Sequence, residues 1–317
     1  GSDNGGSILQ PASYFGVVGL KPSYGRVSLF GLLSITSSTD VVGPLAKNAY
    51  DAALVLKTIA GVDNYDATTA PEGISDYPEA ILKIEDNKKI KDNTLSGLKF
   101  ACPAEYFLKE LEPAIAANLR AVADKFIAAG AEIKEVSLPY TKYGIPVYYI
   151  ITPSEISSNL ARFDGVGWGL AKNEAENLQE FYKLNRGAGF GPEVKRRIML
   201  GTYALSAGYY EAYYKKAQAV RTLIINDFKK AFSEVDFLLT PTTPHAAFKI
   251  GQQVNDPLAM YLEDVFVTGA SLAGLPAISV PAGLIETEKG KRMPIGAQLI
   301  ASRLDEELVL KLARVLE

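Results

Sequence analysis

Five residues near the start of the chain combine small size, turn-forming tendency and a hydroxyl group: Asp3, Asn4, Gly5, Gly6 and Ser7. Two consecutive glycines let the backbone approach a ligand closely and present successive N–H groups toward one point. Such an arrangement suits an oxyanion hole, and a serine at its end could act as a nucleophile. The same residues are also typical of a tight turn that leads into a helix, so on their own they leave both interpretations open.

A serine nucleophile requires a base, and the composition restricts the choice. The chain has one histidine, His245, and one cysteine, Cys102. A Ser-His-Asp scheme would have to use His245, which follows a proline-rich run typical of a rigid loop, and a lone histidine is more often a surface or packed residue. The single histidine and cysteine exclude an intrachain disulfide, multi-histidine metal sites and cysteine-rich zinc sites, so we expect no metal.

Length and composition limit the class of protein. The 317 residues are 48% hydrophobic and 22% charged, with a net charge of −3, which is ordinary for a globular protein and gives no surplus of basic residues for nucleic acid. No apolar run reaches the roughly 18 residues of a transmembrane helix, and the N-terminus lacks a signal-peptide pattern. We expect a cytoplasmic protein without membrane association. The abrupt start, without Met, indicates a piece of a longer chain.

Hydrophobic periodicity predicts the elements that position these residues. Strand, helix and strand patterns over 98–103, 113–130 and 132–138 predict a βαβ-like unit, with the last strand half-buried, and hence the α/β class. Residues 63–96 are expected to be a polar surface excursion with a charged cluster from Lys83 to Lys91. No linker is evident, so we expect one α/β unit. The other predicted elements are helices over 48–60, 192–207, 209–233, 259–273 and 304–316, and strands over 235–239, 276–281 and 293–301.

A wider window favours the catalytic interpretation of the glycine-serine loop. The N-terminal run strongly resembles the amidase signature family, and further motifs resemble the glutaminase subunits of its tRNA-dependent amidotransferases. The motifs, in order along the chain, are 1–12 (GSDNGGSILQPA), 16–28 (GVVGLKPSYGRVS), 154–165 (SEISSNLARFDG), 193–202 (EVKRRIMLGT), 260–264 (MYLED) and 274–281 (GLPAISVP). Several long motifs in the right order are far more specific than one Gly-Gly-Ser.

The resemblance implies an amidase signature fold, with a mixed β-sheet core covered by helices on both faces. It implies that residues 1–317 are the C-terminal two thirds of a single amidase domain. Such enzymes use a serine–serine–lysine triad without histidine. By resemblance Ser7 is the acylated nucleophile, and the N–H groups around Asn4, Gly5 and Gly6 form the oxyanion hole. The bridging serine and the lysine precede the nucleophile in the family, so no residue here is assigned to those roles; Lys21 is expected to be structural.

The amidotransferase members hydrolyse glutamine and pass the ammonia to a partner subunit. The resemblance therefore implies glutamine as substrate, a heterotrimer with B and C subunits, and a misacylated tRNA reached through the complex. It implies no cofactor in this chain, with ATP and Mg²⁺ at the partner subunit. Glutamine needs a cation for its carboxylate and an anion for its ammonium. Arg197 resembles the carboxylate clamp, Asp264 the ammonium partner, and Tyr148, in preference to Tyr149, a further substrate contact.

Two alternatives remain open at this point: a stand-alone amide hydrolase of the same family, and a non-catalytic scaffold that binds partner subunits. Asn4 stands where the family usually has threonine, and Leu9 where it usually has arginine, and either change could alter rate or substrate choice. Trp168 replaces a usual tyrosine. A tyrosine cluster at 209–214 is expected to pack rather than to stack on nucleic acid.

Overall fold

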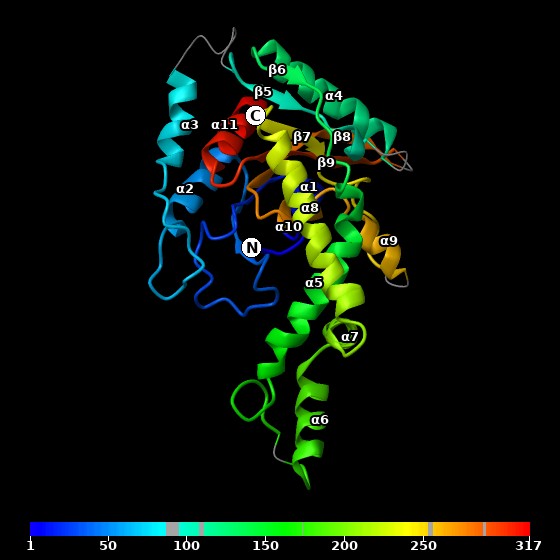
Figure 1. Ribbon diagram of the computed structural model, residues 1–317. Helices are drawn as coiled ribbons and strands as arrows, with labels where there is room; N and C mark the ends of the chain where they lie inside the picture. Colours follow the sequence, from blue (N-terminus) through cyan, green and yellow to red (C-terminus); the bar gives the residue numbers. More distant parts are fainter. Residues whose placement is uncertain (87–94, 108–110, 173, 253–255, 288–289) are drawn as a thin grey trace. The chain divides into compact units, whose positions relative to one another are not determined.

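A seven-stranded mixed sheet forms the centre of the computed structural model, which describes residues 1–317 except 87–94, 108–110, 173, 253–255 and 288–289 (Figure 1). The strand order is β4-β2-β8-β9-β7-β5-β6, in which β5 pairs in parallel with β6 and β7 and the other pairs are antiparallel. The strands are β2 (Val18–Lys21), β4 (Leu45–Ala46), β5 (Lys99–Ala101), β6 (Glu132–Lys134), β7 (Phe237–Pro241), β8 (Ala277–Glu286) and β9 (Arg292–Ala301). A second, two-stranded sheet pairs β1 (Ser2–Asp3) with β3 (Val41–Val42).

Helices cover both faces of the large sheet, as the sequence predicts (Figure 1). One face carries a buried polar row, in which Gln298 donates to Thr240 at 2.7 Å, and α1 (Leu9–Phe15) and α10 (Thr268–Leu272) lie over it. The opposite face carries Phe237, against which Phe126 of α4 packs with ring centroids 5.2 Å apart. The helices on this side are α2 (Ala49–Ile59), α4 (Pro113–Ala128) and α11 (Glu306–Leu316), with α3 (Tyr77–Asp86) outside them. The mixed α/β class is therefore confirmed.

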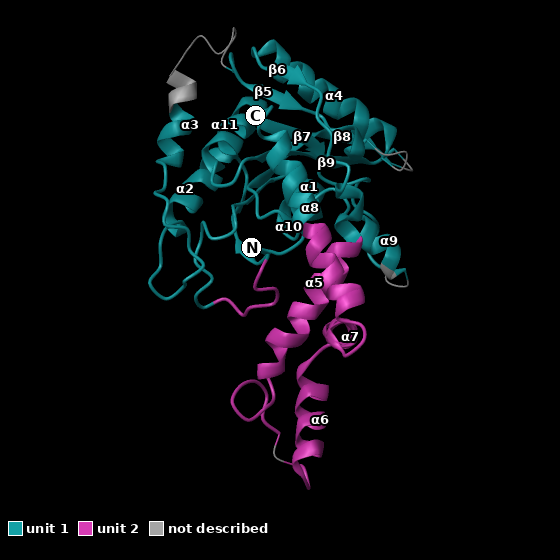
Figure 2. Ribbon diagram, viewed as in Figure 1, with its two compact units in different colours: residues 1–31, 39–145, 222–317 teal, residues 32–38, 146–221 magenta. Residues whose placement is uncertain are grey.

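Clustering of contacts divides the chain into two compact units (Figure 2). The first unit, Gly1–Gly31, Thr39–Ile145 and Thr222–Glu317, contains both sheets. The second, Leu32–Ser38 and Pro146–Arg221, is helical. Helices α5 (Gly144–Asn159) and α8 (Lys216–Ala231) carry the chain between them, so no loop linker marks the division. That these residues belong to a single amidase domain stays a prediction.

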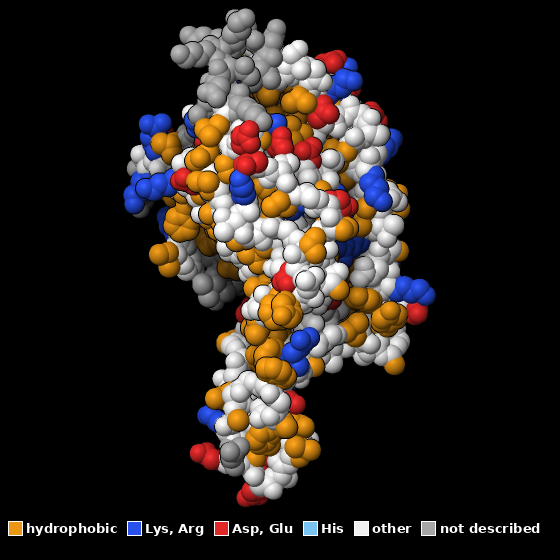
Figure 3. Space-filling model, turned by 90° about the vertical axis from the view of Figure 1, so that its left-hand side faces the viewer, with side chains coloured by type: hydrophobic (Ala, Val, Ile, Leu, Met, Phe, Trp, Pro, Cys, Tyr) orange, Lys and Arg blue, Asp and Glu red, His pale blue; other side chains and the backbone are white. Residues whose placement is uncertain are grey.

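The second unit adds α6 (Leu178–Gly189), α7 (Pro192–Leu205) and a π-helical turn, η4 (Glu211–Lys215). Its tyrosines pack on one another but not into a core: the rings of Tyr203 and Tyr209 lie 4.3 Å apart, while Tyr209 is 41% exposed and Tyr210 42%. Hydrophobic side chains are visibly gathered on the surface of this unit (Figure 3). The expected packing of the 209–214 tyrosines is therefore mutual and superficial. Trp168 is also exposed, at 67%.

Most predicted elements are confirmed, and four differ. Strand β6 covers only Glu132–Lys134 and is exposed rather than half-buried, because it is the sheet's edge strand. The expected surface excursion at 63–96 contains α3, whose Tyr77 and Ile81 are buried against α2 and α11. The predicted helix over 209–233 begins as the π-helical turn η4. The predicted helix over 259–273 is two helices, α9 (Pro257–Leu262) and α10. The side chains of the Lys83–Lys91 cluster lie outside the described residues.

Candidate active site

The glycine-serine loop is held by the carboxylate at its start. Asp3, only 2% exposed, accepts hydrogen bonds from the backbone N–H groups of Gly6 at 2.8 Å and Ile8 at 2.7 Å. One carboxylate therefore fixes the backbone on both sides of Ser7, whose own side chain is exposed. The sequence showed the turn but gave Asp3 no role, because an aspartate at a turn is usually exposed.

Gly6 is required by both space and backbone geometry. Its φ of +127° is a conformation that side chains rarely adopt, and a Cβ atom placed on it would lie 2.2 Å from Cγ2 of Val267. The same Cβ position is 3.6 Å from Oδ1 of Asp264. The loop is thus pressed against the segment 264–267, and the structure brings the predicted nucleophile loop and the predicted ammonium partner together.

Helix α1 binds the same segment from the other side of the loop. Gln10 Nε2 donates to Asp264 Oδ1 at 2.9 Å, and one helical turn later Tyr14 donates its hydroxyl to Glu263 Oε2 at 2.8 Å. Residues four apart share a helix face, so α1 grips two consecutive carboxylates. These carboxylates lie in the turn that separates α9 from α10, where Val265 N bonds to Leu262 O in the tighter i to i−3 pattern. This grip is the physical reason for the break in the predicted helix.

The hydrogen bonds also bear on the predicted oxyanion hole. The Gly6 N–H already donates to Asp3, so in this structure it stabilises the loop and does not point at a ligand. Asn4 is half-buried and Gly5 buried within the same turn. Their N–H groups stay the predicted donors to a developing oxyanion. The departure at Leu9 has a structural reason, since the side chain is fully buried in the core beneath α1.

Lys21 lies beneath this site as a buried cation. The residue is 1% exposed, and its ammonium donates to the carbonyl oxygens of Leu275 at 2.5 Å and Pro22 at 3.3 Å. Burial lowers the pKa of Lys21 to about 8, and the charges of Asp3 and Glu306 oppose that shift. Its bonds run to backbone carbonyls in the core, which fits the expected structural role.

The other predicted substrate residues lie in the second unit. Arg197 on α7 donates from Nε to Glu193 Oε1 at 2.9 Å, one turn earlier, and its guanidinium lies 6.0 Å from the ring centroid of Tyr149 on α5. Burial by itself would lower the pKa of Arg197, but the hydrogen bond to Glu193 and the neighbouring Tyr148 and Tyr149 raise it above its ordinary value. The guanidinium is thus fixed in place and fully charged.

Within the tyrosine pair the structure gives the two rings different surroundings. Tyr148 is 5% exposed and meets Tyr149 edge-to-face at 5.0 Å, whereas Tyr149 is the ring over which Arg197 lies. The predicted residues therefore form two groups, one in each unit: Ser7, its loop and Asp264 in the first, and Tyr148 and Arg197 in the second. Sequence reasoning missed three positioning residues, Asp3, Gln10 and Glu193; only Glu193 had a local signal, the i, i+4 spacing to Arg197.

Two absences among the described residues complete the picture of the site. No group of three or more His, Cys, Asp or Glu side chains among them is arranged to hold a metal ion. Within those same parts of the chain, no helix combines the length and apolar character that crossing a membrane requires.

Comparison with known proteins identifies the family. A family model described as Amidase matches residues 1–310. The chain belongs to the amidase family. Over all 317 residues it is 51% identical to the A subunit of the glutamyl-tRNA(Gln) amidotransferase of Thermodesulfovibrio yellowstonii, of which it covers 62%. The crystal structure of the same subunit from Thermotoga maritima aligns with the whole chain at 39% identity and a TM-score of 0.75, with 61% of that chain covered.

The fold also matches amidases with other substrates. The native peptide amidase from Stenotrophomonas maltophilia aligns with the whole chain at 25% identity and a TM-score of 0.72, and again 61% of that chain is covered. The chain thus spans about three fifths of the length of the relatives it matches. What the longer relatives do as whole proteins comes to this chain only as a proposal.

Proposed function

We propose that this chain is the nucleophile-bearing part of the glutaminase subunit of a tRNA-dependent amidotransferase. Ser7 Oγ attacks the side-chain amide carbon of glutamine, and the C–N bond breaks as the departing nitrogen takes a proton and leaves as ammonia. Water then hydrolyses the ester, releasing glutamate and restoring the Ser7 hydroxyl. The N–H groups around Asn4 and Gly5 stabilise the oxyanion of both tetrahedral intermediates.

The observation that carries this proposal is the Asp3-held loop, which presents an exposed Ser7 beside Asp264. A carboxylate so close to the loop supplies an anion for the ammonium group of an amino-acid substrate. Arg197, held by Glu193 over Tyr149, supplies the cation for the carboxylate. A hydrolase of apolar amides needs neither charge, and the 51% identity to an amidotransferase's glutaminase chain favours the same assignment.

The remaining parts of the reaction belong to other chains or to residues upstream. The bridging serine and lysine base of the family precede the nucleophile, so we expect the 317-residue chain alone to lack glutaminase activity. The ammonia would pass to a partner in a heterotrimer with B and C subunits and amidate Glu-tRNA(Gln) or Asp-tRNA(Asn). ATP and Mg²⁺ would act at that partner, with no cofactor in this chain, and the complex would be cytoplasmic.

The proposal is tested by supplying the upstream segment in the parent enzyme and measuring ammonia release from glutamine. We expect turnover in the parent, none in Ser7→Ala, and none in the 317-residue chain alone. Turnover by the isolated chain that disappears in Ser7→Ala would refute the need for upstream residues. A parent that releases no ammonia would instead favour a non-catalytic scaffold.

A stand-alone amide hydrolase is the second candidate, favoured by the likeness to the Stenotrophomonas maltophilia peptide amidase. Calorimetry with glutamine separates the two, because only the glutaminase needs the charged clamp. We expect the parent to bind glutamine and Arg197→Ala to lose that binding. A parent that cleaves other amides without binding glutamine would support the second candidate.

A further inference from the structure

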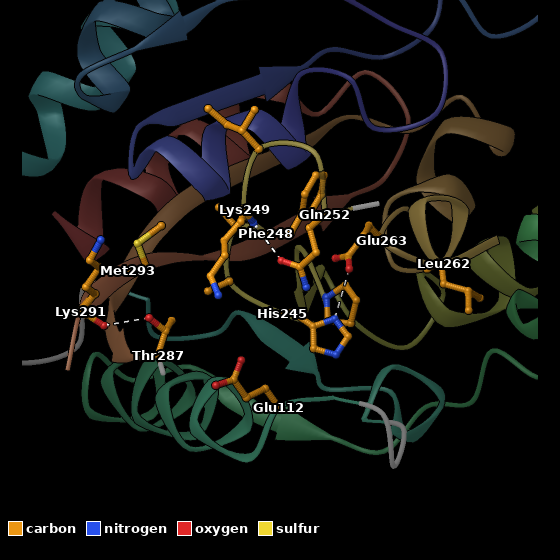
Figure 4. A pocket seen from close by; sticks show the side chains of 15 residues that line it. Glu112, His245, Phe248, Lys249, Gln252, Leu262, Glu263, Thr287, Lys291 and Met293 are labelled. Atoms are coloured by element: carbon orange, nitrogen blue, oxygen red, sulfur yellow. Dashed lines mark hydrogen bonds and ion pairs between the residues drawn. The ribbon is translucent and has the colours of Figure 1, made fainter. Parts of the chain in front are cut away.

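A cavity of about 810 Å³ opens in the first unit, beyond the segment that α1 grips. Its walls come from the start of α4, the loop 244–252, the end of α9 and the facing ends of β8 and β9 (Figure 4). Neither Ser7 nor Asp264 lines it. The volume is that of a small-molecule site, and such sites typically combine apolar walls with a few polar groups.

One wall of the cavity is built from a buried carboxylate that orients the only histidine. Glu263 is 5% exposed and accepts the Tyr14 hydroxyl at 2.8 Å, while its other oxygen lies 3.3 Å from Nδ1 of His245. Burial and the Glu263 carboxylate raise the pKa of Tyr14, so its hydroxyl stays a donor. A histidine whose Nδ1 is fixed by a carboxylate presents Nε2 in a set direction, here on the cavity side (Figure 4).

The rest of the lining offers opposite charges and an apolar surface. Figure 4 shows the Glu112 carboxylate, at the start of α4, and the Lys249 side chain pointing toward the same space from different sides. Phe248, Leu262 and Met293 contribute apolar surface between them. Phe248 is itself fixed, because its ring meets Tyr14 edge-to-face at 5.9 Å. Glu263 already serves Tyr14 and His245, so the charges that remain for a ligand are one anion and the lysine cations.

We propose that this cavity binds a small zwitterion with an apolar side chain, of the size of an aromatic amino acid. The ligand's ammonium group lies between Glu112 and His245 Nε2, its carboxylate meets Lys249, and its side chain packs on Phe248, Leu262 and Met293. Each charge alone could pair with a single-charged molecule, but the two together select a ligand that carries both. This site is separate from the proposed glutaminase chemistry and does not depend on it.

The test uses the 317-residue chain itself and three matched probes: L-phenylalanine, 3-phenylpropanoate, which lacks the ammonium group, and phenethylamine, which lacks the carboxylate. His245 is the only histidine, so its ring signals in an NMR spectrum need no assignment by mutation. We expect L-phenylalanine to shift them saturably, with a Kd about tenfold lower than that of either single-charged probe. No shift with L-phenylalanine, or equal Kd values for all three probes, would overturn the proposal.

Variants locate the binding. Glu112→Gln and Lys249→Gln should each weaken L-phenylalanine about tenfold, whereas Lys125→Gln, an exposed lysine farther along α4, should leave the Kd unchanged. The substituted side chains are not in the core, so the variants should fold, which the unchanged NMR dispersion will verify. Binding that survives both cavity variants would place the ligand elsewhere and overturn the proposal. None of these outcomes depends on glutamine hydrolysis.

Discussion

The change Asp3→Asn tests whether one buried carboxylate holds the nucleophile loop. The wild-type carboxylate accepts the Gly6 and Ile8 N–H groups at 2.8 and 2.7 Å. Asparagine keeps one carbonyl oxygen, so one of these N–H groups loses its acceptor and faces an amide NH₂ group in a buried setting. Losing a charge-assisted hydrogen bond and leaving a buried donor unpaired costs about 2–3 kcal/mol.

The assay is thermal and urea unfolding of the 317-residue chain. At roughly 2 °C per kcal/mol for a chain of this length, Asp3→Asn should lower the Tm by about 4–6 °C. Asp66→Asn is the matched control: Asp66 also accepts two backbone N–H groups, from Leu29 at 2.7 Å and Thr68 at 2.9 Å, but is partly exposed. Water can replace its bonds, so we expect a cost below about 1 kcal/mol. An Asp3→Asn chain as stable as wild type, or no less stable than Asp66→Asn, would refute the reasoning.

Three further predictions concern single side chains. Burial lowers the pKa of Lys21 to about 8 from 10.5, so between those pH values the unfolded chain binds more protons. The free energy of urea unfolding should therefore rise with pH there, by about 3 kcal/mol relative to Lys21→Met, and parallel pH profiles would contradict this. Tyr14→Phe removes the donor to buried Glu263 and should lower that free energy by about 1–3 kcal/mol, whereas exposed Tyr65→Phe should not; equal effects would argue against the grip of α1. In the parent enzyme, Arg197→Lys keeps the charge but loses the planar fork, and should raise the KM for glutamine about tenfold or more in steady-state kinetics; an unchanged KM would remove Arg197 from the site.

The sequence predicted the fold where local pattern decides the outcome. Helix α2 begins as expected, with the Asn48 side chain accepting from Asp51 N at 2.7 Å and capping the first turn. The parallel pairing of β5 and β6 around α4 follows from the strand, helix and strand spacing. The exposed β6 could not be foreseen, because alternation shows which residues share a face but not whether the strand lies at the sheet's edge.

The candidate site was predictable only where a motif names a residue. Ser7, Gly6 and Asp264 could be singled out by resemblance, but the bonds from Gln10 to Asp264 and from Tyr14 to Glu263 join residues about 250 positions apart. Such contacts also end α9 early, because they fix two consecutive side chains that a continuous helix would place about 100° apart. For His245, a lone histidine in a loop carries no signal of the buried carboxylate beside it.

The central claim, that Ser7 forms an acyl-enzyme, is tested most directly by trapping the ester. The parent enzyme, with its upstream segment, would be quenched with acid during glutamine turnover and digested for mass spectrometry. We predict a γ-glutamyl ester on the peptide containing Ser7, present in Ser2→Ala, whose serine is also exposed, and absent in Ser7→Ala. An ester on another residue, or continued glutamine turnover in Ser7→Ala, would contradict the account.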